Sequence, residues 1–208
     1  MNIIEALNWR YAAKNFDSTR IIPNETIEVI KESFNLTASS YGLQPVKLLL
    51  VSNKSILQEL VPISSNQKQV GQASHLCIFC VYTNIDEAYI RTYFENIKFI
   101  RNTPDAVLSS FRDSIISGFG SKSTDEIYNW GAKQAYLALG NMLTVCATQE
   151  IDACPMEGFD PVAYEREKKH IRDVEMPKLE RLAAEFLESD FVGTDGTWWG
   201  SNPSGESD

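Results

Sequence analysis

The chain has 208 residues, of which 43% are hydrophobic and 23% are charged, and its formal net charge is −9. This composition is typical of a globular protein with a sizeable core, and the acidic balance argues against a nucleic-acid-binding protein, which needs a basic face. No apolar run approaches the roughly 20 residues of a membrane span. The N-terminus lacks the basic and apolar regions of a signal peptide, so we expect a cytoplasmic protein.

The predicted elements alternate between helices and strands. Apolar spacing and turn residues predict, in chain order, a helix at 2–15, a helix from residue 24, a polar loop at 37–44, a strand at 46–52, a short helix at 54–61, a strand at 74–83, helices at 86–101 and 104–117, a mobile connection at 118–121, a long helix at 124–149 and a short strand at 151–155. The long helix is apolar nearly all round, which predicts a central, buried position. The strand at 74–83 is apolar on both faces, which predicts the interior of a sheet.

The chain changes character after residue 159. Residues 161–190 are highly charged and helix-prone, and residues 193–208 are a low-complexity run of Gly, Ser, Asp and Trp. Such a composition indicates a segment without a core of its own. We therefore predict a folded domain over residues 1–163 and an acidic tail over residues 164–208, first helical and then disordered.

Cys77 and Cys80 form a Cys-x-x-Cys pair inside the second predicted strand. Such a pair can be a redox site or half of a zinc site. Residues three apart in a strand point to opposite faces, and no second pair of ligands completes a zinc site. We therefore expect two buried strand residues and no metal site.

Four short segments carry the functional signal, although each is weak alone. Arg10 and Lys14 are four apart on the first predicted helix, so both cations point the same way and could bind a phosphate. Such a pair can equally be an ordinary solvated helix face. The segments are residues 10–16 (RYAAKNF), residues 38–45 (ASSYGLQP), Asn66 and residues 155–159 (PMEGF).

In this order and at these separations, the segments resemble the FMN-dependent nitroreductase family of NAD(P)H-linked nitroreductases and flavin or quinone reductases. The resemblance covers about residues 1–163. It implies an α+β fold, with a mixed sheet flanked by helices and a long central helix, in a homodimer. It also implies that FMN supplies the redox chemistry, so that the protein needs no catalytic side chain.

The resemblance further implies which residues bind FMN. The backbone near Glu157 and Gly158 would point at flavin N5, the atom that accepts the hydride. Three positions depart from the family pattern, with Ala12 in place of Ser, Gly42 in place of Asn and Gln69 in place of Lys. The implied cofactor-binding residues are Arg10, Tyr11, Ala12 and Lys14 at the phosphate and ribityl chain, Ala38, Ser39, Ser40 and Gly42 in a loop that reaches the partner's flavin, Asn66 and Gln69 at the polar ring edge, Gln134 near the flavin, and Pro155, Met156, Glu157 and Gly158 across one face.

The implied activity is ping-pong hydride transfer from NAD(P)H through FMN to a small flat acceptor such as a nitroaromatic, a quinone or a flavin. Aromatic residues around Phe111 and Phe119 are expected to cover the acceptor. The tail lacks the apolar strand and the two basic residues with which family members complete the phosphate site. A narrower reductase, acting on a dihydropteridine or an enone, and a flavin-binding protein without turnover therefore stay open as alternatives.

Overall fold

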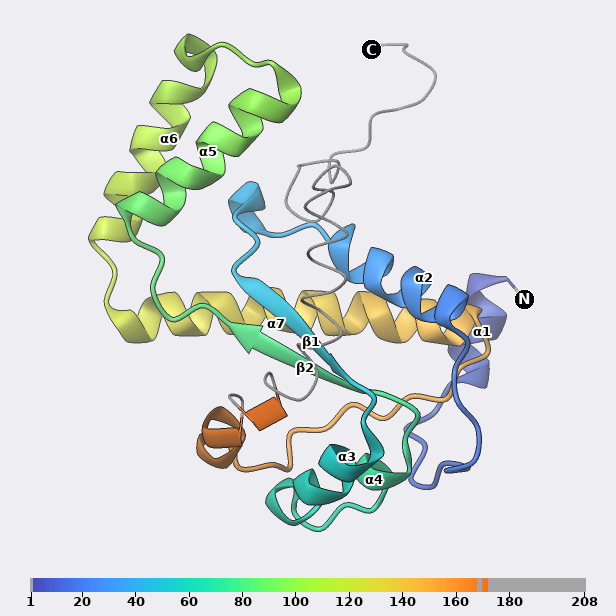
Figure 1. Cartoon of the computed structure of the whole chain (residues 1–208). Coiled ribbons are helices and arrows are strands. Elements are labelled where there is room, and N and C mark those ends of the chain that lie inside the picture. Colours follow the sequence, from blue (N-terminus) through green and yellow to red (C-terminus); the bar gives the residue numbers. More distant parts are fainter. Residues whose placement is uncertain (1, 168–169, 172–208) are drawn as a thin grey trace. The chain divides into compact units, whose positions relative to one another are not determined.

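The computed structural model of the chain describes residues 2–167 and 170–171 (Figure 1). Residues 161–167 and 170–171 are helical. The other elements, in chain order, are α1 (Ile3–Trp9), α2 (Asn24–Asn35), the 3-10 turn η1 (Ser40–Gly42), β1 (Val46–Val51), α3 (Lys54–Leu60), the 3-10 turn η2 (Pro62–Ser64), α4 (Gln69–Gln72), β2 (Leu76–Val81), α5 (Glu87–Arg101), α6 (Asp105–Gly120) and α7 (Thr124–Thr148).

The predicted α+β class is confirmed, and the predicted elements between residues 24 and 149 recur with ends shifted by up to three residues. Two differences concern connections. The mobile connection expected at 118–121 is the last turn of α6. The strand expected at 151–155 is reduced to one isolated parallel bridge between Ala12 and Ala153.

The first helix is shorter than predicted, because α1 ends at Trp9 instead of continuing to residue 15. Arg10 caps it in an extended conformation (φ −69°, ψ 142°), and its N–H still donates to the carbonyl of Ala6. Beyond the cap, the N–H of Ala13 donates to the carbonyl of Ala153 over 3.4 Å. Pairing with a distant segment thus replaces the helical hydrogen bonds that local periodicity suggested.

The sheet is smaller than the predicted mixed sheet. Among the described residues it has two strands, β1 and β2, which run in opposite directions (Figure 1). The N–H of Tyr82 donates to the carbonyl of Pro45 over 2.9 Å and extends the pairing by one step. In the part of the chain that the structure describes, β2 therefore has one neighbouring strand and not the predicted two.

The described chain divides into two compact units. The first contains residues 2–34, 48–79, 139–167 and 170–171, and the second contains residues 35–47 and 80–138. The strands and α7 contribute residues to both units. Within the described residues, no helix is both long enough and apolar enough to cross a lipid bilayer.

The first unit has two apolar clusters. One contains the buried face of α3 with Val51, Val70 and, from beyond the predicted domain boundary, Ile171, which is 1% exposed. Tyr164 packs against the same cluster, and its hydroxyl lies 2.7 Å from the hydroxyl of Ser64. The other cluster joins Ile27 and Ile30 of α2 to the C-terminal half of α7. Burial of each such side chain stabilises the fold by about 1.5–3 kcal/mol.

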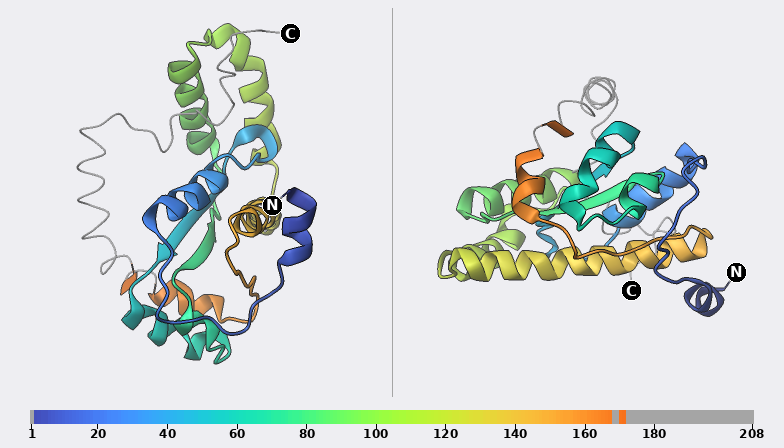
Figure 2. Two further views of the ribbon diagram at one scale, coloured as in Figure 1. Left: turned by 90° about the vertical axis from the view of Figure 1, so that its right-hand side faces the viewer. Right: turned by 90° about the horizontal axis from the view of Figure 1, so that it is seen from below.

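The second unit is built on the pair of helices α5 and α6, which lie side by side (Figures 1 and 2). Phe94 of α5 is 2% exposed, and its ring lies 5.9 Å from that of Phe111 in an edge-to-face arrangement. Phe119 of α6 packs in the same way on Trp130 of α7, with ring centroids 4.9 Å apart. These aromatic pairs join the three helices into one core.

The long helix α7 is buried on one side only, unlike the prediction of a helix buried all round. Ala135, Ala138 and Met142 are buried, whereas Tyr136 and Leu137 are more than half exposed. The apolar content that suggested a fully buried helix is therefore divided between a core face and an exposed apolar face.

At two glycines of α7, Gly131 and Gly140, substitution by Ala should have opposite effects on the free energy of unfolding. A Cβ on Gly131 would lie 2.4 Å from Cγ1 of Val81, whereas a Cβ on Gly140 would meet nothing within 4 Å. Gly131→Ala should lower the free energy of unfolding by about 1–3 kcal/mol because it overpacks a helix–strand contact. Gly140→Ala should raise it by about 0.5–1 kcal/mol because Ala favours the helix. Urea unfolding of both variants measures the difference, and an equal effect would contradict the close approach at Gly131.

Candidate functional site

Arg10 and Lys14 lie on the extended segment after α1 and not, as predicted, on one face of a helix. Both side chains are exposed, and Nζ of Lys14 lies 3.5 Å from Sγ of Cys154. Among the described residues, neither cation forms an ion pair with a carboxylate. Their charges are therefore available to an anion such as a phosphate.

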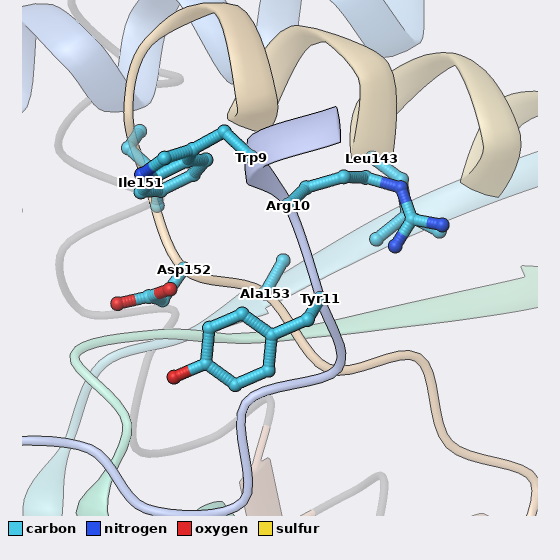
Figure 3. A pocket seen from close by; sticks show the side chains of 7 residues that line it. All are labelled: Trp9, Arg10, Tyr11, Leu143, Ile151, Asp152 and Ala153. Carbon is cyan, nitrogen blue, oxygen red and sulfur yellow. The ribbon is translucent and has the colours of Figure 1, made fainter. Parts of the chain in front are cut away.

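Figure 3 shows that Arg10 and Tyr11 line a small pocket with the start of the segment that follows α7. The Arg10 side chain extends toward Leu143 of α7, and the Tyr11 ring lies by Asp152 and Ala153. The pocket is too small to hold a flavin ring. It shows instead that the N-terminal cation segment and residues 151–153 form one continuous surface.

A second contact, besides the pairing of Ala12 with Ala153, joins the Asn66 segment to Gly158. Nε2 of Gln67 donates to the carbonyl of Gly158 over 2.9 Å, and Nε2 of Gln69 donates to Oε1 of Gln67 over 2.9 Å. The N–H of Asp160 donates to the carbonyl of Ile63 over 2.8 Å. Gln69, a predicted site residue, is buried, and its hydrogen bond orients the side chain of Gln67. Gln67 itself was not among the predicted site residues.

Asn66 is exposed and has a left-handed backbone (φ 55°), as does Ser65 before it (φ 54°). Asn adopts this conformation more readily than most residues. The turn places the amide side chain of Asn66 on the surface of the first unit, where it is free to bind the polar edge of a ligand. No feature of the sequence alone indicated this turn.

Three of the four predicted segments therefore meet in the first unit. The backbone of Ala153 pairs with the Arg10–Lys14 segment, and Gly158 is hydrogen-bonded to the loop that contains Asn66. Pro155, Met156 and Glu157 lie between these two contacts. Residues 153–158 are thus a single strip of backbone with Arg10 and Lys14 at one end and the linked amide side chains of Gln67 and Gln69 at the other.

The fourth segment lies in the second unit, together with Gln134. The N–H of Ser40 donates to Oε1 of Gln134 over 2.9 Å. The hydroxyl of Ser39 accepts the N–H of Gln44 over 3.0 Å, and Gly42 has a φ of 70°. The predicted residues Ala38, Ser39, Ser40 and Gly42 therefore form one ordered loop fixed to α7.

This set of residues suits an organic cofactor better than side-chain catalysis. Two cations can hold a phosphate, amide side chains can bind the polar edge of a ring, and an exposed backbone strip can approach a flat face. No group of three or more His, Cys, Asp or Glu side chains with the geometry of a metal site occurs in residues 2–167 and 170–171. The residues present fit FMN.

Cys77 and Cys80 do not form a disulfide bond with each other. Burial raises the pKa of Cys77 to about 12 and that of Cys146, in the same apolar cluster, to about 11. A buried neutral thiol is a core residue and not a redox centre. Both residues lie in β2, as expected, but they are half-buried and not fully buried.

The raised pKa of Cys77 predicts a loss of stability in alkali. Well below pH 9, at about pH 8 and under, the thiol is mostly neutral in both the folded and the unfolded chain, so its burial has little pH dependence there. Between pH 9 and 12 only the unfolded chain loses the proton, so the free energy of unfolding should fall by about 1.4 kcal/mol per pH unit. Urea unfolding at pH 8, 9 and 10 measures this slope. The slope should diminish in Cys77→Ala, and an unchanged slope in that variant would contradict the prediction.

Comparisons with known proteins agree with the geometry. The sequence profile of the Nitroreductase family matches residues 7–183. A Staphylococcus aureus protein provisionally named an NAD(P)H nitroreductase is 35% identical over 189 residues, which are 88% of this chain and 84% of that protein. The match to the family profile extends beyond residue 163, the last residue that the resemblance of the four segments covers.

Two solved structures share the fold. A nitroreductase-like protein from Streptococcus mutans superposes with a TM-score of 0.71 at 21% identity, covering 80% of each chain. A protein from Exiguobacterium sibiricum, provisionally named a nitroreductase and solved in complex with FMN, superposes with a TM-score of 0.66 at 19% identity, covering 77% of this chain and 76% of that chain. The family profile and the Staphylococcus aureus relative both match most of this chain. This chain therefore belongs to the nitroreductase family.

Proposed function

We propose that this protein is an FMN-dependent oxidoreductase that passes hydride from NAD(P)H to small flat acceptors such as nitroaromatics, quinones and flavins. The observation that carries the proposal is the strip of residues 153–158, which pairs with the Arg10–Lys14 segment at one end and with the Asn66 loop at the other. Flavin N5 supplies the hydride chemistry when FMN is bound.

In this proposal the side chains bind and orient the cofactor. Arg10 and Lys14 hold the phosphate and ribityl chain, with Tyr11 and Ala12 contributing backbone between them. Asn66 would bind the polar edge of the ring, and Gln69, a neutral donor where the family pattern has a cation, would act on that edge through its hydrogen bond to Gln67. Pro155, Met156, Glu157 and Gly158 would lie against one ring face, and the backbone near Glu157 and Gly158 would supply a donor for N5.

We also propose a homodimer in the cytoplasm. Among the described residues, α1 presents an exposed apolar surface, since Ile3, Ile4 and Leu7 are each more than 40% exposed, and Leu137 of α7 is 54% exposed. Surfaces of this kind mark protein–protein interfaces. The loop with Ala38, Ser39, Ser40 and Gly42 then serves the partner's flavin, as the family resemblance implies, and Gln134 belongs to the same part of the site.

Steady-state kinetics test the proposed reaction. Rates are measured with NADPH or NADH varied at several fixed concentrations of a quinone. Since both substrates use one ring face in turn, the double-reciprocal plots should be parallel lines. Intersecting lines would show that both substrates bind together and would contradict the ping-pong scheme, and no turnover with either nucleotide would favour a flavin-binding protein without activity.

A further inference from the structure

The loop of residues 39–44 has a backbone that its sequence does not favour. Tyr41, Gly42 and Gln44 have φ values of 59°, 70° and 49°. Gly adopts the left-handed region freely, but Tyr and Gln do not. Contacts from elsewhere in the second unit must therefore hold the loop in this conformation.

Gln134 of α7 makes the first of these contacts. Its side chain is 7% exposed, Oε1 accepts the N–H of Ser40 over 2.9 Å, and Nε2 donates to the carbonyl of Trp130 over 3.2 Å. The second bond fixes which end of the amide faces the loop, because a flipped amide would present a donor to the N–H of Ser40 and an acceptor to the carbonyl of Trp130.

Tyr89 of α5 makes the second contact. Its hydroxyl donates to the carbonyl of Leu43 over 2.7 Å and lies 3.2 Å from the carbonyl of Gln44. Burial, followed by repulsion from Tyr82 and Tyr93, raises the pKa of Tyr89, so the hydroxyl keeps its proton and remains a donor. The side chain of Leu43 is fully buried, which fixes the same part of the loop from its apolar side.

We propose that Gln134 and Tyr89 are positioning residues that hold the loop of residues 39–44 in the conformation in which it meets the flavin. They act through the N–H of Ser40 and the carbonyl of Leu43. This inference rests on the proposed function, since it takes the loop to be part of the flavin site. It gives α5 a task in that site, and it gives Gln134, which the family resemblance placed near the flavin, a task that it performs through the loop.

Hydrogen exchange of the full-length protein, with and without FMN, tests the proposal. Gln134→Met keeps the side-chain volume and removes both hydrogen bonds, and Tyr89→Phe removes only the hydroxyl. Amide exchange in residues 39–44 should become about tenfold faster in each variant, as expected for one lost hydrogen bond. FMN should bind about tenfold more weakly. Gln134→Glu, which keeps an oxygen facing Ser40, should restore much of the protection of that amide.

Asn141→Leu is the matched control, because Nδ2 of Asn141 donates from the same helix to the carbonyl of Ser33 over 2.8 Å. It should lower Tm and leave both loop exchange and FMN affinity as in the wild type. Wild-type loop exchange and FMN affinity in Gln134→Met and Tyr89→Phe would overturn the proposal. If the wild type bound no FMN, the proposed function would fail, while the exchange data without FMN would still decide whether these residues hold the loop.

Discussion

The variant Arg10→Ala/Lys14→Ala should bind FMN about 10³-fold more weakly than the wild type. Each cation is exposed, and among the described residues neither is paired with a carboxylate, so each can form charge-assisted hydrogen bonds to the phosphate. Such bonds contribute about 1.5–3 kcal/mol each, and tenfold in affinity corresponds to about 1.4 kcal/mol. Quenching of flavin fluorescence on titration with apoprotein gives the two dissociation constants.

The control for this variant removes two positive charges elsewhere. Lys31 is paired with Glu28 on α2 over 2.7 Å, and Arg91 is paired with Glu87 on α5 over 2.6 Å. Lys31→Ala/Arg91→Ala should change FMN affinity by less than about threefold, because exposed charges at a distance are screened by salt. An equal loss in both double variants would mean that overall charge, and not a phosphate site at Arg10 and Lys14, governs binding.

Ile171→Ala should lower the free energy of unfolding by about 2–5 kcal/mol, the usual result of truncating a fully buried Ile. Ile171 is 1% exposed and packs with Leu57, Leu60 and Val70 of the first unit. The loss would be a large share of the 5–15 kcal/mol that is typical of a whole domain. Urea unfolding followed by tryptophan fluorescence measures it.

Ile21→Ala is the matched control, because Ile21 is 59% exposed. It should change the free energy of unfolding by less than about 0.5 kcal/mol. If Ile171→Ala changed the free energy of unfolding equally little, Ile171 would contribute nothing to the core. A domain boundary at residue 163 would then be supported.

The sequence predicted best those elements whose signal is local. The helices α5, α6 and α7 follow apolar spacing over 15 or more residues, and the strands β1 and β2 follow short apolar runs. The end of α1 could not be predicted in this way, because the chain leaves the helix at Arg10 to pair Ala12 with Ala153, 141 positions later (153 − 12). Long-range pairing of this kind overrides helical periodicity.

In the candidate site, too, local signals could be predicted from the sequence and long-range contacts could not. The segments at residues 10–16, 38–45 and 155–159 were found from their residue types and order, and the structure pairs the first with Ala153 and Cys154, directly before the third. The role of Gln67 was not predictable, because its bond to Gly158 joins residues 91 positions apart. Tyr89 was missed for a similar reason, since only the folded unit brings α5 to the carbonyl of Leu43.

The boundary predicted at residue 163 rests on composition alone. The many charged residues after it suggested a tail, and nothing in the composition marks Ile171, among the apolar residues there, as a core residue. Ile171 nevertheless packs in the core of the first unit, and the hydroxyl of Tyr164 is hydrogen-bonded to that of Ser64. The part of the predicted tail after residue 171 lies outside the described residues.

The absorption spectrum of the purified protein, before and after anaerobic addition of NADPH or NADH, tests the central proposal most directly. We expect flavin bands at close to one FMN per chain that bleach on addition of nucleotide, because the protein would bind FMN and reduce it. Yellow protein that stays oxidised would show binding without hydride transfer. Colourless protein that also fails to take up added FMN would contradict the proposed function.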